Sequence, residues 1–103
     1  MVVGAFLGGV AGSQIGARLS EADKVLAGRN LNESLEYDRI GSSREWVNPD
    51  SGNSGYSTPT RTFDAQDGSP CREFTTVVSV GGKEEQAYGT ACRQADGSWK
   101  IQP

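Results

Sequence analysis

Apolar residues dominate the first 17 positions of the chain, and glycines recur there at every fourth position. No charged residue precedes Arg18, and the repeated glycines are Gly4, Gly8, Gly12 and Gly16. Residues four apart lie on one face of an α-helix, so these glycines would form a smooth stripe along it. Each glycine costs a soluble helix about 1 kcal/mol, whereas small residues let two helices approach closely in lipid. The pattern therefore favours a membrane segment or a packing element.

Three interpretations of this segment stand beside that of a disordered glycine-rich tail. A secretory signal peptide needs a basic start and an unbroken apolar run, and the segment has neither. A transmembrane helix needs about 20 residues, whereas residues 1–17 at about 1.5 Å each would span only ~26 Å. We favour the third interpretation, one half of a glycine-striped hairpin whose other half lies upstream. We therefore expect the full-length protein to extend beyond Met1.

The next segment, residues 18–43, is typical of one helix followed by a connector. Ser20 followed by Asp23 forms a weaker version of the capping box. Gly28 is a candidate kink, and Gly41 is the expected stop of the helix. Apolar residues recur at helical spacing, at Ala22, Val25, Leu26, Leu31 and Leu35. We expect this helix to cover one face of a sheet.

From residue 44 to residue 103 the pattern changes to short β-like runs separated by turn formers. Residues 48–55 are a dense cluster of turn residues, and Pro59 confines its strand to an edge or a bulge. Two-residue hairpin signals stand at Gly81-Gly82 and Asp96-Gly97. The predicted fold class is therefore α+β, with one N-terminal helix packed on a four- to five-stranded antiparallel sheet and preceded by the glycine-striped segment.

The two cysteines are predicted to form a cross-strand disulfide. If Gly81-Gly82 is a two-residue loop, Val80 faces Lys83. The same register places Cys71 directly opposite Cys92, at a non-hydrogen-bonded position where Cα atoms lie about 4.5 Å apart. That distance is at the short end of the range that a disulfide accepts. Such a bond would contribute about 3 kcal/mol and indicates an oxidising compartment.

The register also predicts which side chains share a face of the sheet. A turn at Asp96-Gly97 would place Ile101 opposite Cys92, and Trp99 opposite Gln94. One face would then carry the disulfide together with Val77, Tyr88, Trp99 and Ile101. The other face would carry Phe74, Val78, Val80, Ala87 and Ala91.

Composition excludes most catalytic chemistry. The chain has no histidine, so neither a Ser-His nor a Cys-His pair is available, and without a CxxC motif zinc is not expected. Glu84 and Glu85 are adjacent on a strand and point to opposite faces, while the turn with Asp50 and Asn53 lacks EF-hand spacing. The net charge of −3, without a clustered basic face, argues against nucleic acid. We expect no enzyme activity, no cofactor and no metal.

Several runs along the chain match those of a known family. They are residues 46–55 (WVNPDSGNSG), 58–61 (TPTR), 70–74 (PCREF), 87–94 (AYGTACRQ) and 96–101 (DGSWKI). With the glycine zipper of residues 4–16, they resemble the rickettsial 17 kDa surface antigen family of bacterial outer-membrane lipoproteins. The resemblance implies a lipid anchor on an N-terminal cysteine after a signal peptide. It also implies a domain that faces the periplasm or the cell exterior.

The expected function is that of a non-catalytic, outer-membrane-associated surface antigen domain with a structural or host-contact role. Its expected partners are a membrane, through the N-terminal segment, a second copy, through the glycine stripe, and an envelope or host protein. The alternative is a periplasmic binding or inhibitor module that recognises a protein or peptidoglycan. That module would use an aromatic sheet face formed by Trp46, Tyr88 and Trp99, which are otherwise interpreted as core residues.

Overall fold

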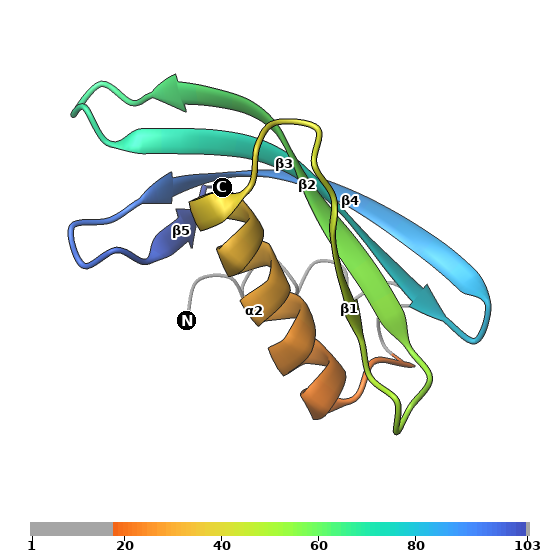
Figure 1. Ribbon diagram of the computed structural model, residues 1–103. Coiled ribbons are helices and arrows are strands. Elements are labelled where there is room, and N and C mark those ends of the chain that lie inside the picture. Colours follow the sequence, from red (N-terminus) through yellow and green to blue (C-terminus); the bar gives the residue numbers. More distant parts are fainter. Residues whose placement is uncertain (1–17, 103) are drawn as a thin grey trace.

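A single helix lies across one face of a five-stranded antiparallel sheet in the computed structural model, which describes residues 18–102 (Figure 1). Each strand pairs with its neighbours in the sequence, in the order β1-β2-β3-β4-β5. This arrangement confirms the predicted α+β class, while the glycine-striped segment lies outside the described residues. The elements are α2 (Glu21–Tyr37), β1 (Arg44–Val47), β2 (Ser54–Asp64), β3 (Pro70–Val80), β4 (Lys83–Arg93) and β5 (Trp99–Ile101).

The predicted capping box begins α2. The Ser20 hydroxyl accepts a hydrogen bond from the Asp23 backbone N–H at 3.1 Å, and the Asp23 carboxylate accepts one from the Ser20 N–H at 2.9 Å. The helix continues through Gly28 and ends at Tyr37, so the predicted stop at Gly41 is wrong. Gly41 instead lies in the connector, where it adopts a φ of 85° and donates its N–H to the carbonyl of Pro59 at 2.8 Å.

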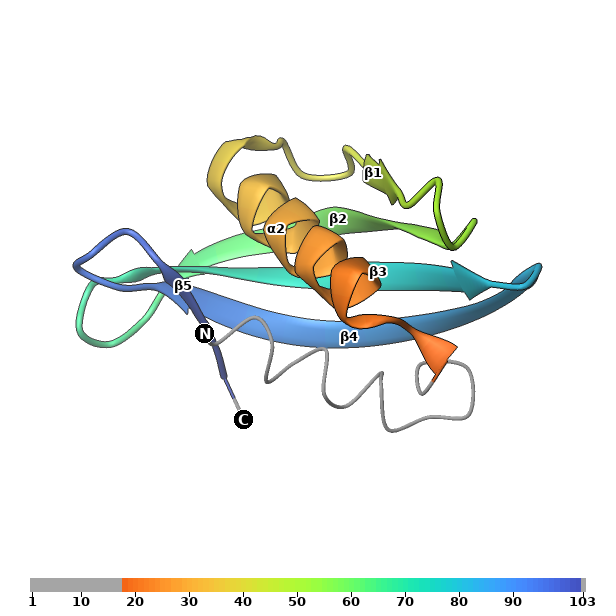
Figure 2. The same ribbon diagram turned by 90° about the horizontal axis from the view of Figure 1, so that it is seen from below.

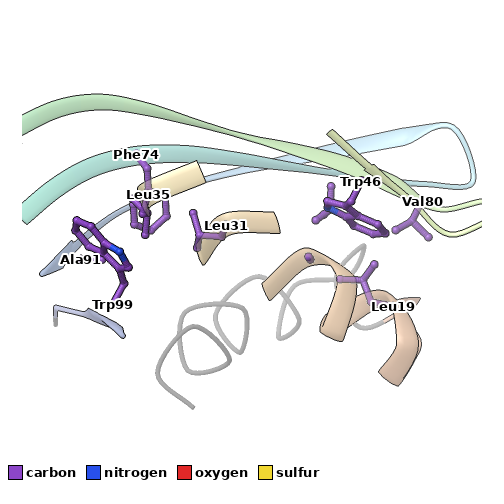
Figure 3. Close-up of a cluster of buried hydrophobic side chains, with 10 residues drawn as sticks. Leu19, Leu31, Leu35, Trp46, Phe74, Val80, Ala91 and Trp99 are labelled. Atoms are coloured by element: carbon purple, nitrogen blue, oxygen red, sulfur yellow. The ribbon is translucent and has the colours of Figure 1, made fainter. Parts of the chain in front are cut away.

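The core lies between α2 and the sheet. Figure 2 shows α2 lying across the sheet, and its contacts are mainly with β1 and β2. In Figure 3, Leu31 and Leu35 of α2 point into this layer, with Trp46 and Trp99 at opposite ends of the cluster. Burial of a side chain such as Leu35, which is 1% exposed, contributes about 1.5–3 kcal/mol. The buried cluster comprises Leu19, Ala27, Leu31, Leu35, Trp46, Phe74, Val78, Val80, Ala91 and Trp99.

The pairing of β5 differs by one residue from the prediction. Trp99 pairs with Arg93, and Ile101 pairs with Ala91, because the β4–β5 loop has three residues rather than two. The Gln94 N–H donates to the Ser98 carbonyl at 2.7 Å, and Gly97 between them has a φ of 87°, as in a type I turn followed by a bulge. A shift by one residue moves every side chain of a strand to the other face. Trp99 and Ile101 therefore face α2 rather than the disulfide.

Turn chemistry explains the remaining register. Gly81 and Gly82 have φ values of 58° and 82°, as a two-residue hairpin loop requires, and Val80 pairs with Lys83 as predicted. In β2 the register shifts between Pro59 and Arg61, which confirms the bulge at the proline.

Candidate functional site

A fully buried carboxylate lies at the N-terminal end of α2. Asp23 has 0% exposed surface, and its oxygens accept hydrogen bonds from four uncharged donors. The amide of Asn48 donates at 2.7 Å, the hydroxyl of Ser51 at 2.7 Å and the amide of Asn53 at 2.8 Å. The fourth donor is the backbone N–H of Ser20. We call Asp23, Asn48, Ser51 and Asn53 the Asp23 cluster.

The donors of this cluster hold Asp23 in its ionised form. Burial alone raises the pKa of a carboxyl group because it removes water from the charged state. The hydrogen bonds from Asn53, the Ser20 backbone, Ser51 and Asn48 outweigh the effect of burial and hold the pKa of Asp23 well below its usual range. The position in the first turn of a helix also favours a negative charge. Asp23 is therefore ionised near neutral pH, and its hydrogen bonds join α2 to the turn between β1 and β2.

The turn between β1 and β2 supplies three of the four donors. Within the turn, the side chain of Asn48 accepts from the Asp50 N–H at 3.1 Å, and the Ser51 hydroxyl accepts from the Asn53 N–H at 3.1 Å. Gly52 completes it with a φ of 75°. The side-chain amide of Asn53 in this turn points at Asp23. In the sequence, the signal for binding a buried carboxylate is the run of small polar donors after Trp46. The acceptor, Asp23, lies too far away in the chain to be recognised from the local pattern.

The predicted disulfide is present. Cys71 and Cys92 are directly paired across β3 and β4, and their Cα atoms lie 4.0 Å apart. Both side chains lie on the sheet face away from α2, where Phe63 of β2 is the neighbour of Cys71. Because both sulfurs are bonded to each other, neither serves as a nucleophile.

The three candidate binding aromatics do not share one exposed face. Trp46 is 6% exposed and Trp99 is 3% exposed, and both pack beneath α2, whereas Tyr88 is 72% exposed on the opposite face of the sheet. The indole of Trp99 donates to the carboxylate of Glu36 at 2.9 Å. The indole of Trp46 lies over Gly55, where an added Cβ would come within 2.6 Å of its nitrogen. The core interpretation is therefore confirmed for both tryptophans and is wrong for Tyr88.

Two turns of the same kind close one end of the sheet (Figure 1). In each, the carboxylate of an Asp-Gly-Ser run accepts from the backbone and the hydroxyl of its own serine, Asp67 from Ser69 and Asp96 from Ser98. These hydrogen bonds lower the pKa of both carboxyl groups. An open pocket of about 510 Å³ lies between the turns and is lined partly by Arg93. Its lining includes neither a cysteine nor a histidine.

Two further features bear on the site. Among residues 18–102, no three acidic, cysteine or histidine side chains converge as metal ligands. None of the helical structure described reaches the length and apolarity needed to cross a bilayer. The predicted packing stripe of Gly4, Gly8, Gly12 and Gly16 lies outside the described part of the chain.

Comparison with known proteins identifies the family. The family model for the 17 kDa outer membrane surface antigen matches residues 33–100. The 17 kDa surface antigen of Rickettsia bellii (strain RML369-C) is 49% identical over 89 residues, which are 86% of this chain and 56% of that protein. The protein of the same name from Rickettsia japonica is 50% identical over 85 residues, covering 82% and 54%.

A third relative agrees with these two. The 17 kDa surface antigen of Rickettsia prowazekii (strain Madrid E) is 48% identical over 81 residues, covering 79% of this chain and 51% of that protein. The chain thus spans about half the length of the curated relatives that it matches. No solved structure matches it. The match to residues 33–100 includes the donor turn of the Asp23 cluster and both cysteines. The chain therefore belongs to the 17 kDa outer membrane surface antigen family.

Proposed function

We propose that this chain forms the folded, non-catalytic domain of a cell-envelope surface antigen, held at the outer membrane, with a structural or host-contact role. The observation that supports this proposal most directly is that the polar side chains of the β1–β2 turn point into the protein. Asn48 and Asn53 are 5% and 7% exposed, and both amides bind the buried Asp23. An enzyme needs convergent polar groups in an accessible cleft, whereas here they hold α2 on the sheet.

The disulfide supports the same proposal. Cys71 and Cys92 are paired within a small domain, and such bonds are typical of proteins in oxidising compartments such as the bacterial periplasm or the cell surface. A covalent cross-link also suits a domain whose core is a single layer between one helix and one sheet, because small domains bury a low fraction of their surface.

The proposal places the membrane at the N-terminal end. The apolar stretch of residues 1–17 would pair through its glycine stripe with another apolar helix, because small residues allow close backbone contact in lipid. The full-length protein would carry a lipid anchor upstream. The sheet would then project away from the membrane and present the face opposite α2 to envelope or host proteins.

Fractionation of cells that express the full-length protein tests this proposal. We expect the protein in the outer-membrane fraction, with a soluble periplasmic protein as the internal control. Recovery in the soluble fraction alone would contradict the proposal. Surface exposure is measured separately, by protease treatment of intact cells, and decides between the periplasmic and the external face.

Glycine variants test the stripe within the same experiment. Gly8→Leu fills the stripe at one position and should reduce helix pairing in the membrane fraction. Gly9→Leu adds the same bulk about 100° away on the helix and should have little effect. Equal behaviour of the two proteins would show that the stripe is not a packing surface.

A further inference from the structure

The sheet has an open edge along β4. β5 pairs only with the last residues of β4, from Ala91 to Arg93. Within residues 18–102, no strand lies beside the earlier part of β4, from Lys83 to Thr90. In the part of the chain that the structure describes, one backbone bond reaches this part from outside β3, from the Gln102 N–H to the Thr90 carbonyl at 2.8 Å.

The register determines which backbone groups face outward. Cys71 and Cys92 form a non-hydrogen-bonded pair, so the N–H and C=O of Cys92 point away from β3. Alternate residues of β4 share this direction, and the bond to the Thr90 carbonyl agrees with it. Three residues therefore present an N–H and a C=O at the open edge without a described backbone partner. They are Glu84, Gln86 and Tyr88.

Charge is distributed unevenly along this edge. The end near the hairpin carries Lys83, Glu84 and Glu85, whereas residues 86–89 are Gln-Ala-Tyr-Gly and uncharged. Charged residues normally protect an edge strand from pairing. In an antiparallel pairing of two β4 strands, however, the charged end of each strand lies beside the uncharged end of the other. The edge is therefore protected against parallel self-pairing and permits the antiparallel one.

We propose that two copies of this chain associate through β4, antiparallel, about a two-fold axis at Gln86. Glu84 of each copy then pairs with Tyr88 of the other, and Gln86 pairs with Gln86. Glu85 lies opposite Ala87, so no two like charges face each other. All three outward-facing residues gain hydrogen bonds, and the two sheets become one continuous sheet.

Neighbouring registers are less favourable. Sliding the strands toward the hairpins places Glu85 opposite Glu85, or Glu84 opposite Glu84, and like charges directly opposite are destabilising. Sliding them the other way brings Lys83 of the second copy opposite Ala91, which already pairs with Ile101 of β5. The register centred on Gln86 uses every free group without a like-charge pair. It requires Gln102 to leave the Thr90 carbonyl, because Gly82 of the second copy takes that position.

The proposed contact also changes the environment of Tyr88. Its side chain is 72% exposed and stands beside the edge, where it would cover the aliphatic part of Glu84 from the second copy. A contact limited to residues 84–88 is far smaller than the ~1,600 Å² of a standard stable interface. The dimer should therefore form at high protein concentration and dissociate on dilution.

Sedimentation velocity of the full chain over a concentration series tests the proposal. We expect the weight-average mass to rise from 10.9 kDa toward twice that value. Tyr88→Glu places a carboxylate opposite Glu84 at two symmetry-related positions. At about 0.2–1 kcal/mol for each pair, it should weaken association by about twofold to thirtyfold. Adding Glu84→Lys to Tyr88→Glu creates opposite charges in the same register and should restore association.

Two control measurements on the same samples examine whether the variants fold and whether the β4 edge is open in the monomer. Circular dichroism should show the same fold for all three proteins, since both substituted side chains are exposed. A chain that stays monomeric at every concentration would overturn the proposal, as would a double variant that fails to regain association. Slow hydrogen exchange of the Gln86 and Tyr88 amides in the monomer would also overturn it, because the edge would then be occupied by the chain itself.

Discussion

Asn53 donates its side-chain amide to the buried carboxylate of Asp23 at 2.8 Å, across 30 residues of sequence. This bond joins the first turn of α2 to the turn between β1 and β2. It explains why a polar turn and a helix cap that look independent in the sequence form one buried unit. The turn residues are donors, and the second residue of the capping box is their common acceptor.

Asn53→Ala should destabilise the domain by about 1.5–3 kcal/mol, because it removes a hydrogen bond to a buried charge. Asp50→Ala changes an exposed side chain in the same turn and should stay within about 0.5 kcal/mol of the wild type. The free energy of unfolding in urea measures both. Equal stability of the two variants would show that the bond to Asp23 contributes nothing.

Stability should fall as the pH falls below about 4. The folded pKa of Asp23 lies well below the usual value, while in the unfolded chain it is about 3.9. Between these two values the unfolded state binds more protons than the folded state, so acid favours unfolding. The stabilisation is fully present above about pH 5 and is lost progressively toward the folded pKa.

Asp23→Asn is the matched variant for this pH dependence. It should be less stable at pH 7 and should lose less of its stability between pH 5 and pH 2. Glu36 and Asp38 also have lowered pKa values, chiefly from hydrogen bonds with Arg93 and Arg44 respectively, and they keep part of the acid dependence in the variant. Parallel pH profiles of variant and wild type would contradict the assignment to Asp23.

Burial of both indoles gives a third prediction. Acrylamide should quench the tryptophan fluorescence of the folded protein weakly and that of the urea-unfolded protein strongly, because Trp46 and Trp99 pack beneath α2. Gly55→Ala forces a methyl group against the backbone carbonyl of Val77 and against the indole of Trp46. It should cost about 1–3 kcal/mol through overpacking. Strong quenching of the native protein would instead show that the tryptophans are exposed, as a binding surface requires.

Local turn chemistry accounts for what could be predicted from the sequence. Gly81-Gly82 has one favoured hairpin geometry, which determines the β3–β4 register and brings Cys71 opposite Cys92. The predicted cap with Ser20 forms for the same reason, since its partners lie within one helical turn. In each case the interacting residues are close in sequence or are connected by one tight loop.

The errors come from choices that local sequence does not determine. Asp96-Gly97 fits loops of two or three residues, and the three-residue loop moves Trp99 to the side of α2. There its indole reaches Glu36, which a local pattern cannot indicate. The Asp23 cluster was missed because its acceptor and its donors belong to elements whose packing becomes evident only in three dimensions.

The disulfide supports the last prediction. Reducing Cys71–Cys92, or replacing both residues with serine, removes a cross-link between positions 21 residues apart. It should lower the free energy of unfolding by about 2–4 kcal/mol, chiefly because the unfolded chain regains the entropy of an open loop. Thiol titration of the unreduced, unfolded protein provides the control and should detect no free thiol. If urea midpoints with and without reductant coincide, the cross-link has no stabilising role, and the packing of Leu35, Phe74 and Trp99 suffices to hold the sheet and helix together.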